Sequence, residues 1–366
     1  MNRAHADFPL QRLIRLVSER VIKTDINGHI HKVEITRKNR LLFELELGGS
    51  KRWYEWIDDE PYEIKESKDK EIPLANHLSK SSFAAATRTL SYRPKRRLTL
   101  LDQSGNKPVI RKGFRRGQLD KMIHNYETAH EAFSGRGISA PNIIEYDYED
   151  ECLVMVYEEG ERLRLSSDSA DIFHLVGEAL RAFQDHRPEN KGFGLDDEME
   201  VIDKRSKRLL KASGELPDGW KELRKRLEES SEQIPESAYG LAHRDLHDKQ
   251  FVQHTNYLTL LDFDLMTCAD TALDPANFLA HLVLRNLQEA QGATQRSIDI
   301  CGKKFLQGLD RNEEPGFWER LRYYQATSFC RLALVYELRP RWQHLVPALV
   351  TMGNRCLDDL HRIQRR

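Results

Sequence analysis

The chain of 366 residues lacks the features that define secreted, zinc-stabilised and membrane-spanning proteins. Its five cysteines are widely scattered and have no Cys-x-x-Cys spacing, which argues against a disulfide framework or a zinc site. The first 20 residues contain no apolar core of a signal peptide, and no run of about 18 apolar residues occurs anywhere. We therefore expect a cytoplasmic protein without a membrane span.

An excess of charge of one sign is also missing. The 57 Lys and Arg residues balance 58 Asp and Glu residues, so the net charge of −1 is not that of a nucleic-acid-binding or membrane-surface protein. Hydrophobic residues make up 39% of the chain and charged residues 31%, which is typical of a globular protein with a heavily charged surface. The length fits two or three folded units.

The stretch 241–281 concentrates residues that are able to do chemistry. It reads LAHRDLHDKQFVQHTNYLTLLDFDLMTCADTALDPANFLAH. Short apolar segments on either side of the turn-forming residues 254–256 predict a tight hairpin. Asp245 precedes this hairpin and Asp262 follows it, so the hairpin can bring both carboxylates to one site.

Phosphoryl transfer from ATP requires residues of these kinds. One carboxylate accepts the proton of the attacking hydroxyl, and a second carboxylate with a neutral oxygen ligand holds Mg²⁺ on the phosphates. Asp245 suits the first role, and Asp262 together with Gln250 suits the second. A hairpin with ordinary surface acids is the simpler interpretation of any one of these residues, but the complete set with its spacing favours catalysis.

The motifs HRDLHDKQ, LLDFD and DPANFLAHL together resemble the catalytic and metal-binding segments of aminoglycoside phosphotransferase and choline kinase-like small-molecule kinases. The resemblance implies a protein kinase-like fold, ATP and Mg²⁺ as cofactors, and a small-molecule hydroxyl as acceptor. It implies that Asp245 is the catalytic-loop aspartate and that Asp262 and the trailing Asp264 form the metal motif. Asp274 matches an acid with a structural role. The family usually carries Asn where this chain has Gln250, whose amide oxygen lies on a stem one methylene longer.

The resemblance extends from about residue 89 to the end of the chain and sets the expected architecture. We expect an α+β, two-lobed protein kinase-like fold with a β-rich N-terminal extension, a small β-rich N-lobe and a mainly helical C-lobe. The expected boundaries are 1–84 for the extension with its charged linker, 85–157 for the N-lobe and 158–366 for the C-lobe.

The extension lies outside the resemblance. Its sequence predicts an amphipathic helix at 9–22 and strands at 31–35 and 41–47. Trp53 and Trp56 form either an interaction surface or, more commonly for such residues, the contact that packs the extension onto the rest of the protein. The highly charged segment 60–80 is expected to be a linker or a partly solvated helix.

Within the N-lobe, a kinase needs a cation on the third strand and a Glu on the helix that follows it. Lys112 fits the first role, with Arg111 as the alternative because the strand register is uncertain by one residue. Glu127 fits the second role, and Glu131, one turn later, is its alternative. The elements predicted for this lobe are strands at 88–92, 97–101, 108–112, 143–148 and 152–157 and a helix at 117–133.

The first turn of the N-lobe lacks the glycines that cover phosphates in protein kinases. The basic residues 95–97, and Arg97 in particular, either supply that interaction by charge or form a solvated turn. Tyr157 and Glu158 begin the connector between the lobes, where the resemblance places the adenine, and Gly160 is expected to make the connector flexible.

The C-lobe is predicted to be mainly helical. Apolar residues at helical spacing predict a buried face in 172–183, and the charged segment 198–230, broken near 214–219, predicts a helical insertion. The acidic residues at 196–200 either bind a cationic acceptor, such as an amino sugar or amino alcohol, or form a solvated face, which is the commoner role of such clusters. Further helices are expected at 278–288, 294–309, 315–336 and 342–363.

The sequence thus predicts an ATP-dependent kinase of a small-molecule hydroxyl. Lys249 either steadies the γ-phosphate or is a surface lysine. A pseudokinase, in which nucleotide binding serves a partner contact, is the alternative favoured by Gln250 and by the missing glycine loop. A protein kinase is disfavoured, because the segment 265–274 is too short for a peptide-binding activation segment.

Overall fold

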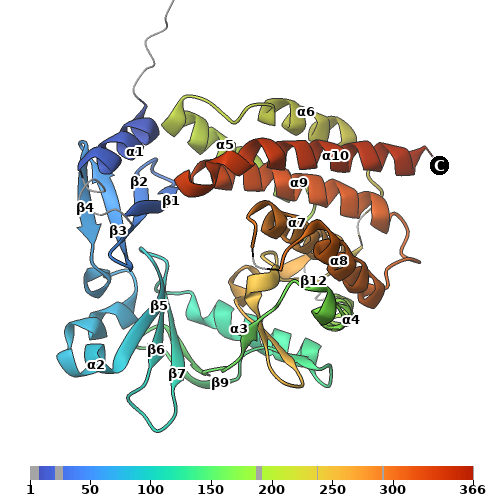
Figure 1. Cartoon of the computed structure of the whole chain (residues 1–366). Coiled ribbons are helices and arrows are strands. Elements are labelled where there is room, and N and C mark those ends of the chain that lie inside the picture. Colours follow the sequence, from blue (N-terminus) through green and yellow to red (C-terminus); the bar gives the residue numbers. More distant parts are fainter. Residues whose placement is uncertain (1–7, 21–27, 187–191, 237, 291, 366) are drawn as a thin grey trace, which may run out of the picture.

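The computed structural model describes residues 8–20, 28–186, 192–236, 238–290 and 292–365. These residues form an N-terminal extension, a small lobe built on a five-stranded sheet, and a large, mainly helical lobe (Figure 1). The architecture is the α+β, two-lobed arrangement that the sequence predicts.

The extension consists of a helix and an antiparallel sheet whose strands follow each other in chain order. Its elements are α1 (Pro9–Arg20), β1 (His29–Ile35), β2 (Leu41–Leu47), β3 (Ser50–Ile57) and β4 (Glu60–Ile64). The buried face of α1 carries Leu10, Leu13 and Val17, at the spacing that produces one apolar side of a helix.

The segment 60–80 is neither a solvated linker nor a solvated helix, which corrects the expectation drawn from its charge. After β4 it forms two 3₁₀ helices, η2 (Glu66–Lys68) and η3 (Pro73–Ser79). Leu74 is almost fully buried, and it lies so close to Gly113 that a Cβ added at the glycine would come within 2.8 Å of its side chain. A short apolar run inside the charged segment therefore packs onto the small lobe.

The extension contacts both lobes. Trp53 is 3% exposed, and its indole N–H donates to the backbone carbonyl of Tyr92 in the small lobe (3.0 Å). The backbone N–H of Val33 donates to the carbonyl of Leu338 in the large lobe (2.7 Å). Trp53 thus packs the extension onto the rest of the protein, as expected.

The small lobe contains three strands, a helix and two further strands, as predicted. Its antiparallel sheet has the spatial order β5-β6-β7-β10-β9, with the helix α3 on it. The bounds are β5 (Thr87–Arg93), β6 (Arg97–Asp102), β7 (Val109–Phe114), α3 (Leu119–Phe133), β9 (Ile143–Asp147) and β10 (Cys152–Val156), with α2 (Ser81–Ala86) before β5 and the short β8 (Ile138–Ser139) before β9.

The large lobe is mainly helical and includes two small sheets, β11-β13-β14-β8 and β12-β15. The predicted break in the insertion is present, because Gly214 (φ 79°) ends one helix and Gly219 (φ 71°) precedes the next. The helices are α4 (Asp171–Asp185), α5 (Leu195–Ser213), α6 (Trp220–Ser231), α7 (Leu273–Leu287), α8 (Gln295–Leu309), α9 (Phe317–Glu337) and α10 (Val346–Gln364), with η4 (Ser167–Ser169), η5 (Asp248–Gln250), η6 (Phe263–Leu265) and η7 (Pro340–Leu345) between them. The strands are β11 (Glu161–Arg162), β12 (Tyr239–Ala242), β13 (Phe251–Gln253), β14 (Leu258–Leu260) and β15 (Thr267–Asp270).

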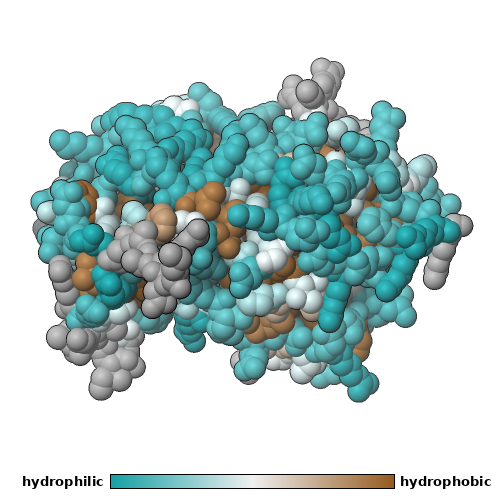
Figure 2. All heavy atoms as spheres, turned by 90° about the horizontal axis from the view of Figure 1, so that it is seen from above, coloured by the Kyte–Doolittle hydropathy of each residue, from teal (hydrophilic) through white to brown (hydrophobic). Residues whose placement is uncertain are grey.

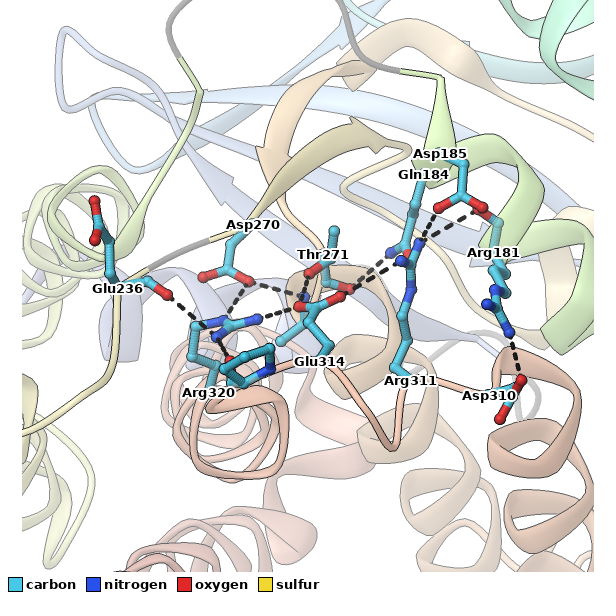
Figure 3. A network of polar contacts seen from close by, with 12 residues as sticks. Arg181, Gln184, Asp185, Glu236, Asp270, Thr271, Asp310, Arg311, Glu314 and Arg320 are labelled. Carbon is cyan, nitrogen blue, oxygen red and sulfur yellow. Dashed lines mark hydrogen bonds and ion pairs between the residues drawn. The ribbon is translucent and has the colours of Figure 1, made fainter.

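A buried polar network holds the β12–β15 pair against the helices behind it (Figure 3). Arg320 on α9 is fully buried, and its guanidinium forms ion pairs with Asp270 (3.1 Å) and Glu314. Thr271 donates to Glu314 (2.6 Å), and Gln184 on α4 donates to the carbonyl of Thr271 (2.7 Å). Because β12 leads into residues 243–250, the loop expected to be catalytic and called the catalytic loop below, this network fixes the position from which that loop starts.

The exterior matches the high charged content of the sequence. Seen from above, where α1, α5, α6 and α10 lie in Figure 1, the surface is largely hydrophilic (Figure 2). Among the residues that the structure describes, no helix is both long and apolar enough to cross a bilayer. The five cysteines are buried and unpaired, in agreement with their scattered positions.

Candidate active site

The hairpin of β13 and β14 brings the catalytic loop next to Asp262 and Asp264, which together are called the acidic motif below. Phe251 pairs with Leu260, and the backbone N–H of Leu261 donates to the carbonyl of Gln250 (2.8 Å). Gln250 therefore lies beside the residue that precedes Asp262. The hairpin that the apolar–turn–apolar pattern predicts is thus confirmed.

His243 and Asp274 fix the backbone of the catalytic loop. The fully buried Asp274 carboxylate accepts the backbone N–H groups of His243 (2.6 Å) and Arg244 (2.8 Å). The His243 ring accepts the N–H of Asp245 at Nδ1 (3.3 Å), so its Nε2–H donates to the carbonyl of Leu261 (2.7 Å). The ring links the loop of Asp245 to the acidic motif, and Asp274 has the structural role implied by the resemblance.

Two residues at the site adopt a left-handed backbone that non-glycine residues rarely occupy. They are Arg244 (φ 64°), next to Asp245, and Asp262 (φ 68°), the first of the two acids in the LLDFD motif. Such conformations each cost about 1–3 kcal/mol and concentrate at functional sites, where the surrounding structure enforces them.

Both expected cations reach the acidic motif. The Lys112 ammonium on β7 lies 2.8 Å from Asp262 Oδ1 and 2.5 Å from Asp264 Oδ1. The Arg97 guanidinium on β6 lies 2.9 Å from Asp262 and 2.8 Å from Asp264. Arg111 is excluded from this role, because it points to Asp102 (2.7 Å) instead.

The network controls the protonation of its members. Burial alone would raise the pKa of Asp262, but Lys112 and Arg97 hold it well below its usual value. Burial alone would lower the pKa of Lys112, yet the carboxylates of Asp262 and Asp264 raise it. Asp262 is therefore ionised and Lys112 is charged across the physiological pH range.

The structure does not form the expected pair between Lys112 and Glu127. The Glu127 carboxylate is exposed and accepts the phenolic O–H of Tyr146 (2.9 Å), and Glu131 is also exposed. The residue of α3 that faces the lysine is the buried Tyr126, whose oxygen lies 3.4 Å from the Lys112 ammonium. The bounds of the helix agree with the prediction to within two residues. The choice of Glu127 by residue type is wrong, because the neighbouring Tyr126 is the residue on the face of α3 toward Lys112.

Asp245 and Lys249 lie on the exposed side of the catalytic loop. Asp245 is partly exposed, and the Lys249 side chain is exposed while its backbone N–H donates to His247 Nδ1 (3.2 Å). The His247 ring lies 4.9 Å from the buried ring of His281. Burial lowers the pKa of His247, against the opposing charge of Asp245, so this histidine is neutral near pH 7.

The connector rests on the hairpin. Glu158 lies 3.5 Å from the Tyr257 hydroxyl, and the carbonyl of Glu159 lies 2.9 Å from His254 Nδ1. Tyr157 is partly buried. A Cβ at Gly160 would come within 2.6 Å of the Gln253 carbonyl, so the glycine is required for close packing. This corrects the expectation that Gly160 makes the connector flexible.

Sequence reasoning missed residues that support the loop from α7. Asn277 donates its amide to the carbonyl of Leu246 (2.9 Å), and Arg285 forms a buried double contact with Asp248 (2.9 Å to each oxygen). Asn277 lies in the DPANF motif and could have been proposed from it. The pairing of Arg285 with Asp248 connects residues far apart in the chain and left no local pattern.

The donor set suits a hard divalent cation. Asp262 and Asp264 place carboxylate oxygens around one point, where the Lys112 ammonium contacts both of them, and the amide-bearing Gln250 ends η5 directly before β13. Mg²⁺ is bound in proteins through carboxylates, carbonyl oxygens and substrate phosphates. The residues present therefore fit Mg²⁺ associated with a nucleotide.

A comparison with models of protein families decides the affiliation. Residues 96–300, more than half of the chain, match the phosphotransferase enzyme family. The chain belongs to this family. The matched range begins next to Arg97, includes Lys112, and contains the catalytic loop and the acidic motif. A search of curated proteins found no match.

Solved structures show that this phosphotransferase family member has the fold of small-molecule kinases. The choline kinase LicA from Streptococcus pneumoniae superposes with a TM-score of 0.53 at 17% identity, covering 78% of this chain and 99% of LicA. The amicoumacin kinase hAmiN, in complex with AMP-PNP, Ca²⁺ and Ami, superposes with a TM-score of 0.56 at 12% identity, covering 76% of this chain and 92% of hAmiN. The expected resemblance is thus confirmed for the fold.

Proposed function

We propose that this chain is an ATP- and Mg²⁺-dependent phosphotransferase that acts on a hydroxyl of a small molecule. The observation that carries the proposal is the convergence of Lys112 and Arg97 on Asp262 and Asp264, beside the loop that presents Asp245. Family membership and the nucleotide analogue bound to amicoumacin kinase support it.

The residues divide the chemistry between them. Asp245 accepts the proton of the acceptor hydroxyl as that oxygen attacks the γ-phosphorus of ATP, while ADP leaves. Lys112 and Arg97 bind phosphate oxygens and compensate their charge, with Lys249 at the open side of the loop. Asp262, Asp264 and Gln250 would hold Mg²⁺, which would supply positive charge to neutralise the phosphates. Tyr157 and Glu158 line the adenine end.

The decisive experiment measures ADP release from ATP and Mg²⁺ across a panel of sugars, amino alcohols, hydroxy acids and aminoglycosides. Asp262→Ala serves as the blank, and Asp245→Asn is expected to lower kcat about 10²- to 10⁴-fold because the proton acceptor is lost. Asp299→Asn, an exposed change on α8, is the matched control and keeps full activity. Unchanged phosphoryl transfer in Asp245→Asn refutes the assignment of Asp245 as the proton acceptor.

A pseudokinase is the second candidate. It is favoured by the complete neutralisation of both metal-motif acids by Lys112 and Arg97, and by Gln250 in place of the usual Asn. This function predicts nucleotide-induced stabilisation that does not require Mg²⁺, together with no acceptor-stimulated ADP release.

A further inference from the structure

Two histidines and a glutamate meet on the first two strands of the extension (Figure 1). His29 and His31 lie on β1, and Glu46 lies on β2 as the direct cross-strand partner of His29. Each of the three side chains offers one nitrogen or oxygen atom, and these atoms all lie within 4.8 Å of one another. Within the described part of the chain, this is the one group of three His, Cys, Asp or Glu side chains arranged in this way. Imidazole nitrogens with a carboxylate oxygen are a ligand set for a divalent transition metal.

An irregularity in β1 places both histidines on one face of the sheet. The pairing of β1 with β2 shifts register between Ile30 and Lys32, as it does where a β-bulge adds a residue to one strand. Ile30 and Val33 are three positions apart, yet both are buried. Strict alternation would place Val33 on the same face as His29 and His31. The register shift separates them, so the two histidines share the face opposite the buried Val33.

The three side chains can be reached by an ion from solution. Their exposed fractions are 31% for His29, 39% for His31 and 28% for Glu46. His29 Nε2 lies 3.8 Å from Glu46 Oε2. Two ligand atoms of one tetrahedral Zn²⁺, with bonds of about 2.0–2.1 Å, lie about 3.4 Å apart. This pair is therefore close to the spacing that the metal requires, and the partly exposed ring of His31 reaches the same point by rotating about its side-chain bonds.

Charged neighbours divide between the two glutamates of β2. Glu44 is 13% exposed in its side chain, lies 3.8 Å from His31 Nε2 and pairs with Lys32 (3.7 Å). Lys51 on β3 approaches Glu46, and its ammonium lies 3.8 Å from Oε2, the oxygen that also faces the first histidine. Glu44 is thus engaged beside the group of three, whereas a metal ion and Lys51 would compete for one oxygen of Glu46.

A cross-strand ion pair is the simpler interpretation of one histidine beside one glutamate. Such a pair occurs on α4, where His174 Nδ1 lies 3.6 Å from Glu178 Oε2, and no third ligand among the described residues joins it. The group on β1 and β2 differs by its second histidine. Because Glu46 already has Lys51 as a cationic neighbour, two further imidazoles add little to its pairing, but they complete a set of metal ligands.

We infer that the extension binds one divalent transition-metal ion, with Zn²⁺ as the expected occupant, through His29, His31 and Glu46. Three protein ligands leave the fourth tetrahedral position to water or another small ligand. The nitrogen ligands distinguish this site from the acidic motif and Gln250, whose oxygen ligands suit Mg²⁺. The buried cysteines take no part, so the site is not of the cysteine type against which the sequence argues.

The metal site is separate from the proposed kinase chemistry. It lies outside residues 96–300, the range that matches the phosphotransferase family. The ion would join β1 to β2 in a sheet that contacts the small lobe through Trp53 and the large lobe through Val33. A ligand that binds only the folded state stabilises that state. The expected role of the metal is therefore to hold the extension together, and not to take part in phosphoryl transfer.

A titration with Co²⁺ tests the site, because Co²⁺ substitutes for Zn²⁺ and its visible absorption reports tetrahedral coordination. The full-length protein is freed of metal with EDTA and dialysed, and the titration is run in excess Mg²⁺, which occupies the acidic motif. The wild type is expected to take up one equivalent of Co²⁺ with a tetrahedral spectrum, which added Zn²⁺ abolishes. If calorimetry under the same conditions detects no binding of Zn²⁺, the inference is overturned.

Variants locate the bound ion. His29→Ala, His31→Ala and Glu46→Gln should each weaken Zn²⁺ binding by at least about 10- to 100-fold, since the loss of even an outer partner of a metal ligand has that effect. The matched control is His174→Ala, which removes the isolated His–Glu pair on α4 and should bind Zn²⁺ like the wild type. Melting curves recorded in EDTA show that each variant is folded. Zn²⁺ binding that survives in all three variants, or that is lost equally in the control, refutes the site.

Lys51→Met provides a test in which binding improves. The substitution keeps the alkyl stem and removes the ammonium that competes for Glu46, so the affinity for Zn²⁺ should rise about two- to fivefold, the value of an exposed ion pair. Unchanged or weaker binding contradicts the placement of the ion beside Glu46. All of these measurements follow metal binding and not phosphoryl transfer, so a failure of the proposed kinase function leaves their outcome intact.

Discussion

Substitution of Lys112 by Met is the perturbation that most directly tests the proposed site. The ammonium is 7% exposed in its side chain, and it contacts both acids of the metal motif. Lys112→Met keeps the alkyl stem and removes only the charge, so Asp262 and Asp264 are left with Arg97 alone. Breaking a buried ion pair in this way costs about 3–5 kcal/mol. The melting temperature should fall by roughly 5–10 °C.

The same variant should lose catalysis. Without the ammonium, kcat/KM should drop by about 10²-fold or more, as expected when a preorganised charge is removed from a phosphoryl-transfer site. Arg111→Met is the matched control, because Arg111 is the adjacent residue on β7 and pairs with Asp102 outside the site. It is expected to destabilise the fold while changing kcat/KM less than threefold.

A compensating substitution tests the electrostatic argument itself. Lys112→Met combined with Asp264→Asn leaves one acid facing Arg97, so at least half of the lost stability should return. Differential scanning fluorimetry and chemical denaturation measure the stabilities, and coupled ADP release measures kcat/KM. The reasoning is refuted if Lys112→Met melts like the wild type, or if Arg111→Met reduces kcat/KM equally.

Other predictions concern pH, the connector and the extension. Burial holds the pKa of His281 well below 6.5, so only the unfolded chain binds a proton at this residue as the pH falls below 6.5. The free energy of unfolding should therefore decrease by up to about 1.4 kcal/mol per pH unit. His281→Asn should flatten this slope in pH-dependent denaturation. Gly160→Ala should cost about 1–3 kcal/mol by overpacking and weaken ATP binding, whereas Gly105→Ala, whose Cβ would meet its nearest atom at 3.8 Å, should cost little. Trp53→Phe leaves a buried carbonyl of β5 without its donor and should cost about 1–3 kcal/mol in urea denaturation, more than Trp56→Phe.

Each of these predictions has an outcome that contradicts it. An unchanged pH slope in His281→Asn means that other groups cause the acid sensitivity. Equal stability and ATP affinity for the Gly160 and Gly105 variants mean that the connector does not require close contact with the hairpin. A larger loss of stability for Trp56→Phe than for Trp53→Phe means that Trp56, and not Trp53, anchors the extension.

The proximity of Asp245 and Asp262 follows from local sequence. The hairpin between Asp245 and Asp262 is short, so its pairing brings the loop and the acidic motif together without help from distant residues. The strand order of the small lobe could also be predicted, since apolar alternation and turn residues are local signals. The alternation of side chains along a strand predicts that Lys112 and Arg111 face opposite sides of β7. The local sequence does not indicate which of the two sides faces Asp262 and Asp264.

Tertiary structure decided the rest, because contacts between distant segments leave no periodic pattern. The orientation of α3 about its axis places Tyr126, and not Glu127, next to Lys112. The apolar run around Leu74 turned an apparently solvated segment into a packed one. The proximity of Asp245 and Asp262 is thus determined by the local sequence of the hairpin, whereas the partners of Lys112 and the packing of the segment around Leu74 arise only when distant segments meet.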